Sequence, residues 1–114
     1  MSIERIRFKA VLFQALAHPT RIAILELLRN GELSAGALAE GLALKQVNVS
    51  QHLHILRTSG LVASRRDSRH FFYRVSHREL FQILDVLKQY AYDLLKESSD
   101  LMEELRSEHD TMGS

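Results

Sequence analysis

Residues 34–60, SAGALAEGLALKQVNVSQHLHILRTSG, carry the clearest structural pattern in this chain. Ser34 is placed to cap a short helix that ends near residue 42, and Gly41 gives the backbone freedom to turn there. A second helix begins near Gln46 and ends at the Gly that closes the stretch. Its apolar residues recur at i, i+4 and i+7 on one buried face: Val49, Leu53 and Leu56. The stretch predicts two short helices joined by a tight turn.

Two further helices are expected before this pair. Ile3, Ile6 and Phe13 follow the three-and-four rhythm of one face of a first helix. Pro19 suits the first turn of the next helix, because its missing N–H and fixed φ cost nothing there. The Asn-Gly pair at 30–31 ends that helix.

After residue 60 the pattern changes from helical to extended. Residues 61–66 and 69–75 flank a polar turn at Asp67-Ser68, which predicts a β-hairpin. The Ser-x-x-Glu of residues 76–79 fits a capping box, and the helix that it opens runs without Gly or Pro to about Arg106. Residues 107–114 are expected to be a disordered tail. We therefore predict one domain over residues 1–106, mainly α-helical with one β-hairpin, in the order α-α-α-α-β-β-α.

Charge is distributed unevenly along the chain. Residues 45–78 carry seven Lys or Arg against one acid, Asp67, whereas residues 79–114 carry three basic and nine acidic groups. The net charge of +1 hides this asymmetry. Since local charge of one sign indicates partners better than the net value does, we expect a polyanion to bind the middle third of the chain.

The helix that follows the tight turn presents a polar face opposite its buried one. Gln and Asn side chains pair with adenine, and Arg and Ser with phosphate or guanine. A polar helix face is often merely solvated. The hairpin tip, however, places Arg65, Arg66 and Arg69 close together with a single acid, and a bound anion would relieve the repulsion between their positive charges. We therefore predict a winged helix-turn-helix that binds double-stranded DNA. The predicted DNA-binding residues are Lys45, Gln46, Asn48, Ser50, Gln51, His54, Arg57, Arg65, Arg66 and Arg69.

Four short runs resemble the ArsR/SmtB family of winged-helix repressors in order and spacing: residues 15–21 (ALAHPTR), 49–53 (VSQHL), 59–62 (SGLV) and 65–69 (RRDSR). The resemblance covers about residues 8–95. It implies a symmetric dimer formed by the first and last helices, and a repressor that leaves its operator when an inducer binds. Ser68 departs from the family, which usually has Gly at this turn, so the geometry of the turn stays open.

The residues themselves also favour a dimer. The last helix carries an apolar stripe broader than one partner surface needs, and the first helix offers apolar side chains to match. If both stripes were only internal core, the last helix would not need its length of roughly 28 residues, about 42 Å. We predict a homodimer through Ile3, Ile6, Phe13, Leu84, Leu87, Ala91 and Leu94. Twofold symmetry would place the two DNA-reading helices about 34 Å apart on an inverted-repeat operator.

No residue pattern identifies an inducer. The thiolate-sensing branch of the family carries Cys-x-Cys at the positions of Ser34 and Gly36, and this chain has no cysteine. A zinc-binding branch uses four ligands on the paired last helices; His77, Glu79 and Asp93 occupy three of those positions, but the fourth is a Tyr, which is a rare zinc ligand. We therefore expect no metal and no cofactor. The alternative is a repressor that responds to zinc or another divalent metal through these three residues.

Other classes of function fit less well. Ser50 and His54 lie one helical turn apart, but no acid lies between Glu40 and Asp67 to orient such a pair, so we expect no enzyme. A structural dimer, or a winged helix that binds protein or RNA, stays open as a third class. The longest apolar runs are far shorter than the roughly 20 residues of a membrane span, and we expect a cytoplasmic protein.

Overall fold

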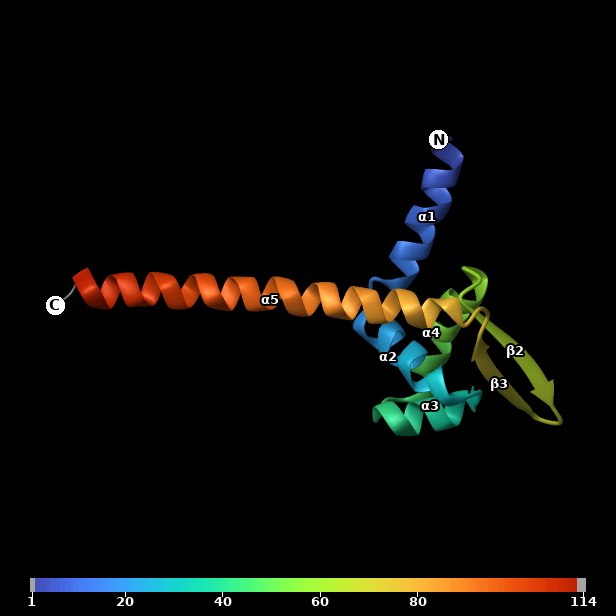
Figure 1. Ribbon diagram of the computed structural model, residues 1–114. Coiled ribbons are helices and arrows are strands. Elements are labelled where there is room, and N and C mark those ends of the chain that lie inside the picture. The colour runs from blue at the N-terminus through green and yellow to red at the C-terminus, as the bar shows by residue number, and fades with distance from the viewer. Residues whose placement is uncertain (1, 113–114) are drawn as a thin grey trace. The chain divides into compact units, whose positions relative to one another are not determined.

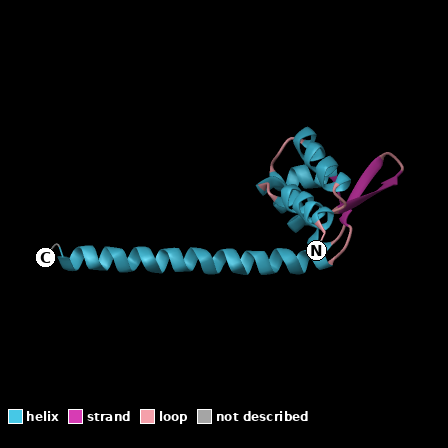
Figure 2. Cartoon of the chain, turned by 90° about the horizontal axis from the view of Figure 1, so that it is seen from above, coloured by secondary structure: helices cyan, strands magenta, loops and turns pink. Residues whose placement is uncertain are grey.

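The computed structural model describes residues 2–112, which form two compact units, one ending at Leu80 and the other beginning at Phe81 (Figure 1). The described part of the second unit, residues 81–112, is helical (Figure 2). The predicted order of elements is confirmed, with one short strand added before the third helix. In chain order the elements are α1 (Ile3–Leu16), α2 (Pro19–Leu27), the 3-10 turn η1 (Leu28–Asn30), β1 (Leu33–Ser34), α3 (Ala35–Leu42), α4 (Gln46–Thr58), β2 (Val62–Asp67), β3 (His70–Val75) and α5 (Glu79–Met112).

The core of the first unit lies where α2, α3 and α4 pack together. The inward face predicted for α4 is confirmed, because the three apolar residues assigned to it, Val49, Leu53 and Leu56, are fully buried. Each side chain buried in this way stabilises the fold by roughly 1.5–3 kcal/mol relative to an exposed one. This burial fixes which face α4 turns to solvent. The largest fully buried side chains described are Ile24, Leu25, Leu28, Leu38, Val49, Leu53 and Leu56.

The helices of the first unit begin as their sequences indicate. Pro19 occupies the first turn of α2, and the Nδ1 atom of His18 accepts a hydrogen bond from the backbone N–H of Thr20 at 3.1 Å. Ser34 caps α3, since its Oγ accepts from the backbone N–H of Ala37 at 3.1 Å.

No single helix within residues 2–112 has the length and apolar character of a membrane span. Helix α1 and residues Pro19–Asn30 reach that composition only as a pair, which is bent by 84°.

The ends of α3 and α4 use the same motif with different residues. At each end the chain enters the left-handed region, with φ of 54° at Ala43 and 82° at Gly60. The next residue then bonds back to the helix: Leu44 N–H donates to the Ala39 carbonyl at 3.0 Å, and Leu61 N–H to the Leu56 carbonyl at 2.9 Å. The turn predicted at Gly41 is therefore wrong, because Ala43 makes it.

Gly41 has a packing role instead. A Cβ atom at Gly41 would lie 3.3 Å from the Cδ1 of Leu27, closer than most real contacts of this kind. The small residue lets α3 approach α2.

The short strand β1 was not predicted. It pairs antiparallel with β3, joining Leu33 to Tyr73 and Ser34 to Phe72, so the strands of the first unit run in the order β1-β3-β2. Two residues are too few to carry a readable alternation. This pairing joins the middle of β3 to the start of α3.

The hairpin itself forms as predicted, from Val62 paired with Val75 to Asp67 paired with His70. Its two-residue turn puts Ser68 at φ 59°, a left-handed conformation that usually favours Gly. Ser68, at which the sequence departs from the family, therefore adopts a positive φ.

Helix α5 differs from its prediction at both ends. It begins at Glu79, not directly after Ser76, so the expected capping box does not form in the expected register. At its other end the helix continues to Met112, so residues 107–112 of the expected disordered tail are helical; residues 113–114 lie outside the described residues.

Candidate nucleic-acid interface

Helix α4 presents its predicted polar face to solvent. Each predicted residue on this helix and its N-cap is exposed: Lys45, Gln46, Asn48, Ser50, Gln51, His54 and Arg57. At 100° per residue, Gln51 and His54 share one stripe with Val47, which is also exposed. Gln46, Ser50 and Arg57 form a second stripe about 90° around the helix. The exposed face of α4 therefore consists of two stripes, whereas the prediction from the sequence grouped their residues together.

His52 differs from its neighbour His54 because it is half-buried. Its ring lies against that of His18, with 4.3 Å between the centroids. Burial lowers the pKa of His52, and the nearby His18 and Arg21 lower it further. His52 thus belongs to the contact between α2 and α4, and it is not on the exposed face.

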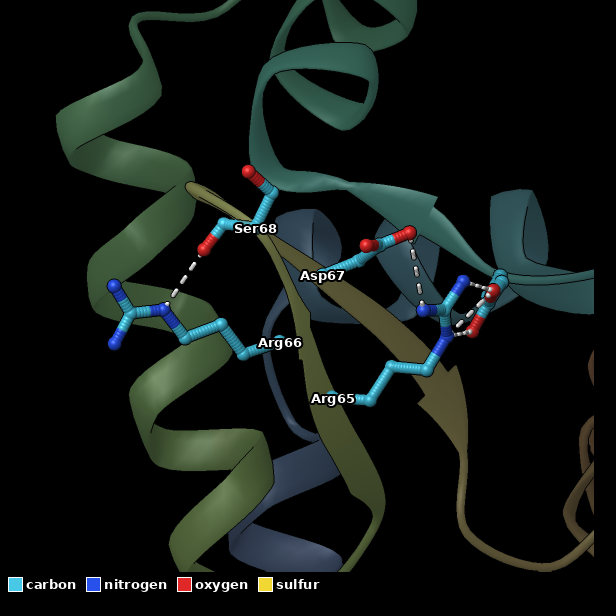
Figure 3. A network of polar contacts seen from close by, with 5 residues as sticks. Arg65, Arg66, Asp67 and Ser68 are labelled. Carbon is cyan, nitrogen blue, oxygen red and sulfur yellow. Dashed lines mark hydrogen bonds and ion pairs between the residues drawn. The ribbon is translucent and has the colours of Figure 1, made fainter.

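The wing has two chemically different faces. Side chains alternate along a strand, so cross-strand partners share a face. Arg66 pairs with Phe71 on one face, with its guanidinium carbon 5.8 Å from the ring centroid. Arg65 pairs with Phe72 on the other face, at 4.8 Å. Figure 3 shows the two arginines leaving β2 on opposite sides.

Arg65 is held by acidic groups of the protein. Its Nε atom lies 2.9 Å from both carboxylate oxygens of Glu32, its Nη2 also donates to Glu32, and its Nη1 lies 3.7 Å from Asp67 (Figure 3). The hydrogen bond from Arg65 lowers the pKa of Glu32, and the same bond raises the pKa of Arg65. Arg65 was predicted to bind phosphate; here it pairs with Glu32 in the segment before β1, and its contact with phosphate stays a prediction.

Arg66 and Arg69 are less constrained. Arg66 donates from Nε to the backbone carbonyl of Ser68 at 3.0 Å, so both Nη groups point away from that bond (Figure 3). Arg69 lies at the exposed tip of the hairpin. Of the three predicted wing arginines, Arg66 and Arg69 are therefore the two without an acidic partner among the described residues.

A recess of about 640 Å³ joins the helices to the wing. It brings together Gln46 and Ser50 from α4 with Arg69 from the wing, three residues that were predicted separately as DNA contacts. Its remaining polar lining was missed: Ser34, Glu40, His70 and Tyr73. The alternation of residues 70–75 would have placed Phe71 and Tyr73 on one face, but no sequence signal says that this face meets α3 and α4.

The candidate metal ligands do not gather in this chain. His77 lies in the turn before α5, Glu79 is the first residue of α5, and Asp93 accepts a hydrogen bond from Gln89 at 3.0 Å. Among residues 2–112, no three His, Asp or Glu side chains are grouped so that they could hold a metal ion. These positions do not favour the metal-responsive alternative.

The predicted dimer residues are exposed, with one exception. On α1, Ile3, Ile6 and Phe13 face solvent, and so do Leu87, Ala91 and Leu94 on α5. Leu84 is 5% exposed, and its role in a dimer stays a prediction. On α5 the side chains of Ile83, Val86, Leu87 and Tyr90 line an apolar hollow of about 430 Å³. Ile83, Val86 and Tyr90 were not among the predicted dimer residues.

Comparisons with known proteins identify similar helix-turn-helix regulators. The sequence model of a helix-turn-helix domain matches residues 16–65. The HTH-type transcriptional regulator Rv0081 of Mycobacterium tuberculosis is 36% identical over 102 residues, which cover 89% of this chain and 90% of that protein. The biofilm growth-associated repressor of Agrobacterium fabrum is 36% identical over 78 residues, 68% of this chain and 67% of that protein.

Solved structures extend the likeness to three dimensions. The crystal structure of Rv0081 superposes with a TM-score of 0.76, covering 84% of this chain and 97% of that chain. A fragment of Mb0332 from Mycobacterium bovis, described as a homodimeric winged helix-turn-helix domain and a possible ArsR-family regulator, is 26% identical with a TM-score of 0.75, covering 85% and 93%. The chain therefore belongs to the ArsR/SmtB family of winged helix-turn-helix, DNA-binding transcriptional regulators.

Proposed function

We propose that this regulator is a repressor that binds an inverted-repeat operator as a homodimer, without a metal site and without enzymatic activity, in the cytoplasm. The observation that carries the proposal is the recess in which Gln46 and Ser50 of α4 lie beside Arg69 of the wing. It makes the polar helix face and the cationic hairpin parts of one surface, as an interface with duplex DNA requires.

The two stripes of α4 contact different parts of the DNA. Gln51 and His54, with Val47, form the outermost stripe and read base edges in the major groove, and Asn48 contributes from its flank. Lys45, Gln46, Ser50 and Arg57 contact the sugar-phosphate backbone. Arg66 and Arg69 carry the wing onto the backbone or into the adjacent minor groove. Arg65 is paired with Glu32, which competes with phosphate for its guanidinium.

The exposed apolar faces of α1 and α5 support pairing of two copies. Side chains such as Phe13, 67% exposed, and Leu87, 49% exposed, would be costly to leave in water on a lone subunit. Mb0332, whose fold this chain shares, is described as homodimeric. A twofold dimer places the two copies of α4 about one turn of DNA, roughly 34 Å, apart.

The repressor assignment follows relatives that are named as repressors, such as those of Agrobacterium fabrum and Xylella fastidiosa. A repressor blocks transcription by occupying its operator, so its affinity must be high and specific at physiological salt. Release would come from an inducer that binds the DNA-free form more tightly.

Selection of bound fragments from the source genome by the purified protein tests the proposal. We expect one enriched sequence with twofold symmetry, occupied by two chains per site in sedimentation, with binding that weakens steeply as salt rises. Transcription in vitro from a template carrying the enriched sequence should fall when the protein is added. Enrichment of sequences without symmetry, or a single chain per site, would contradict the dimeric operator.

A further inference from the structure

The recess between the helices and the wing has a chemistry of its own. Arg69 supplies a cationic guanidinium, Ser50 and Tyr73 supply hydroxyls, and Gln46 supplies an amide. Within the described part of the chain these four side chains have no hydrogen-bonding or ionic partner. Tyr73 is half-buried, so its hydroxyl is held near one position and its direction is restricted. Four convergent polar groups without internal partners fit a small, highly charged oxygen ligand.

The position of the recess on α4 indicates which oxygen ligand it binds. Gln46 and Ser50 lie on the wing-side stripe, about a quarter turn from the stripe of Gln51 and His54. A helix in the major groove has its outermost face on the base edges and its flanks toward the two phosphate backbones. The wing-side flank therefore faces one backbone.

We infer that the recess seats a single phosphate of the DNA backbone, bound by Arg69 and by the Tyr73 hydroxyl, with Gln46 and Ser50 beside it. The inference rests on the proposed function and deepens it, because it assigns binding to Tyr73 in a strand of the sheet. One phosphate held jointly by α4 and the wing fixes the angle between them on the duplex. Glu40 also lines the recess and opposes an anion there, which limits the affinity of the site.

The shape of the recess depends on Gly36. A Cβ atom at this position would lie 3.5 Å from the Oε1 of Gln46 and 3.9 Å from the Oγ of Ser34, both ordinary contacts. A methyl group is therefore tolerated, whereas a longer side chain would project toward the lining groups. Gly36→Leu then blocks the recess without removing any charge, and Gly36→Ala is its matched control.

Binding of two duplexes tests the site: one carrying the sequence that the protein selects, and an unrelated duplex of the same length. Tyr73→Phe should weaken binding to both by about tenfold, because a hydrogen bond to a phosphate carries no sequence information. Tyr92→Phe on α5 is the control and should change neither. Arg69→Gln should weaken both and flatten the salt dependence by about one unit of slope. The double variant should lose less than the product of the single losses, because both groups hold one phosphate.

Neutral methylphosphonate linkages, placed one at a time along the selected duplex, give a second readout that does not depend on how well the variants fold. In the wild type, one position in each half-site should cost affinity, and that cost should shrink in Arg69→Gln and in Gly36→Leu but not in Gly36→Ala. Identical position profiles in all these proteins, with Gln51→Ala still relaxing sequence preference, would overturn the phosphate site and leave the regulator intact. Failure of the wild type to bind either duplex would overturn both.

Discussion

Arg65 and Glu32, 33 positions apart in the sequence, form a two-pronged ion pair in which the Arg65 Nε atom lies 2.9 Å from each carboxylate oxygen. The guanidinium also covers the ring of Phe72 at 4.8 Å. One arginine of the most cationic segment is therefore engaged in contacts within the protein. Glu32 lies next to β1, so the pair and the β1–β3 ladder fasten the wing at the same place.

Glu32→Gln should strengthen DNA binding at low salt severalfold and steepen its salt dependence by about one unit of slope. The substitution removes the carboxylate that competes with phosphate for Arg65. Stability should change little, because an exposed ion pair contributes weakly. Gel shifts at several salt concentrations measure the slope, and Glu26→Gln on α2, which breaks the pair with Arg29 of η1, is the control. Equal slopes in the two variants would show that Arg65 does not reach DNA.

Ala43→Gly should stabilise the protein by about 0.5–1 kcal/mol. Ala43 occupies the left-handed position at the end of α3, where an L side chain is strained and Gly is not. Gly60→Ala is the reverse change in the same motif, and a Cβ there meets nothing within 4 Å, so its effect is purely conformational. It should destabilise by about 1 kcal/mol. Urea unfolding measures both, and changes of the same sign would contradict the strain argument.

Ser68→Gly should stabilise the hairpin turn by up to about 1 kcal/mol, because its φ of 59° is unfavourable for Ser. Hydrogen exchange of the β2 and β3 amides should slow relative to that of the α2 amides. A faster exchange in the wing would mean that the Ser68 side chain stabilises the turn by a contact of its own.

The unfolding free energy should fall as pH drops below about 6.5. Burial lowers the pKa of His52 in the folded state, so over this range the unfolded chain binds a proton that the folded chain does not. Above that range both states hold neutral His52 and its contribution is constant. His52→Asn should flatten the change between pH 5.5 and pH 8 in urea unfolding, whereas His54→Asn, on the exposed face, should not. Matching curves for the two variants would remove His52 as the cause.

Gln51→Ala and Arg66→Ala should weaken DNA binding in different ways. The first removes a base-reading side chain, so affinity for the selected sequence should fall by about 1–3 kcal/mol while unrelated DNA is bound as before. The second removes a phosphate contact, so all sequences should lose similarly and the salt slope should fall by about one. Equal losses of specificity in both variants would contradict this division.

Features that depend on neighbouring residues could be predicted from the sequence. The three-and-four spacing of Val49, Leu53 and Leu56 set the inward face of α4, and a polar pair between extended runs set the hairpin, because both patterns repeat within a few residues. The positive charge of the middle segment and the motifs of the family could likewise be identified from the sequence.

Which of those groups act together depends on long-range contacts in the folded chain. Arg65 and Arg66 are adjacent and chemically identical, yet alternation along β2 sends one to Glu32 and leaves the other with free Nη groups. The position of β1 and the recess that adds Tyr73 to Gln46 depend on the same kind of long-range contact. Such contacts join residues tens of positions apart, and no local periodicity encodes them, because the folding of the intervening chain brings them together.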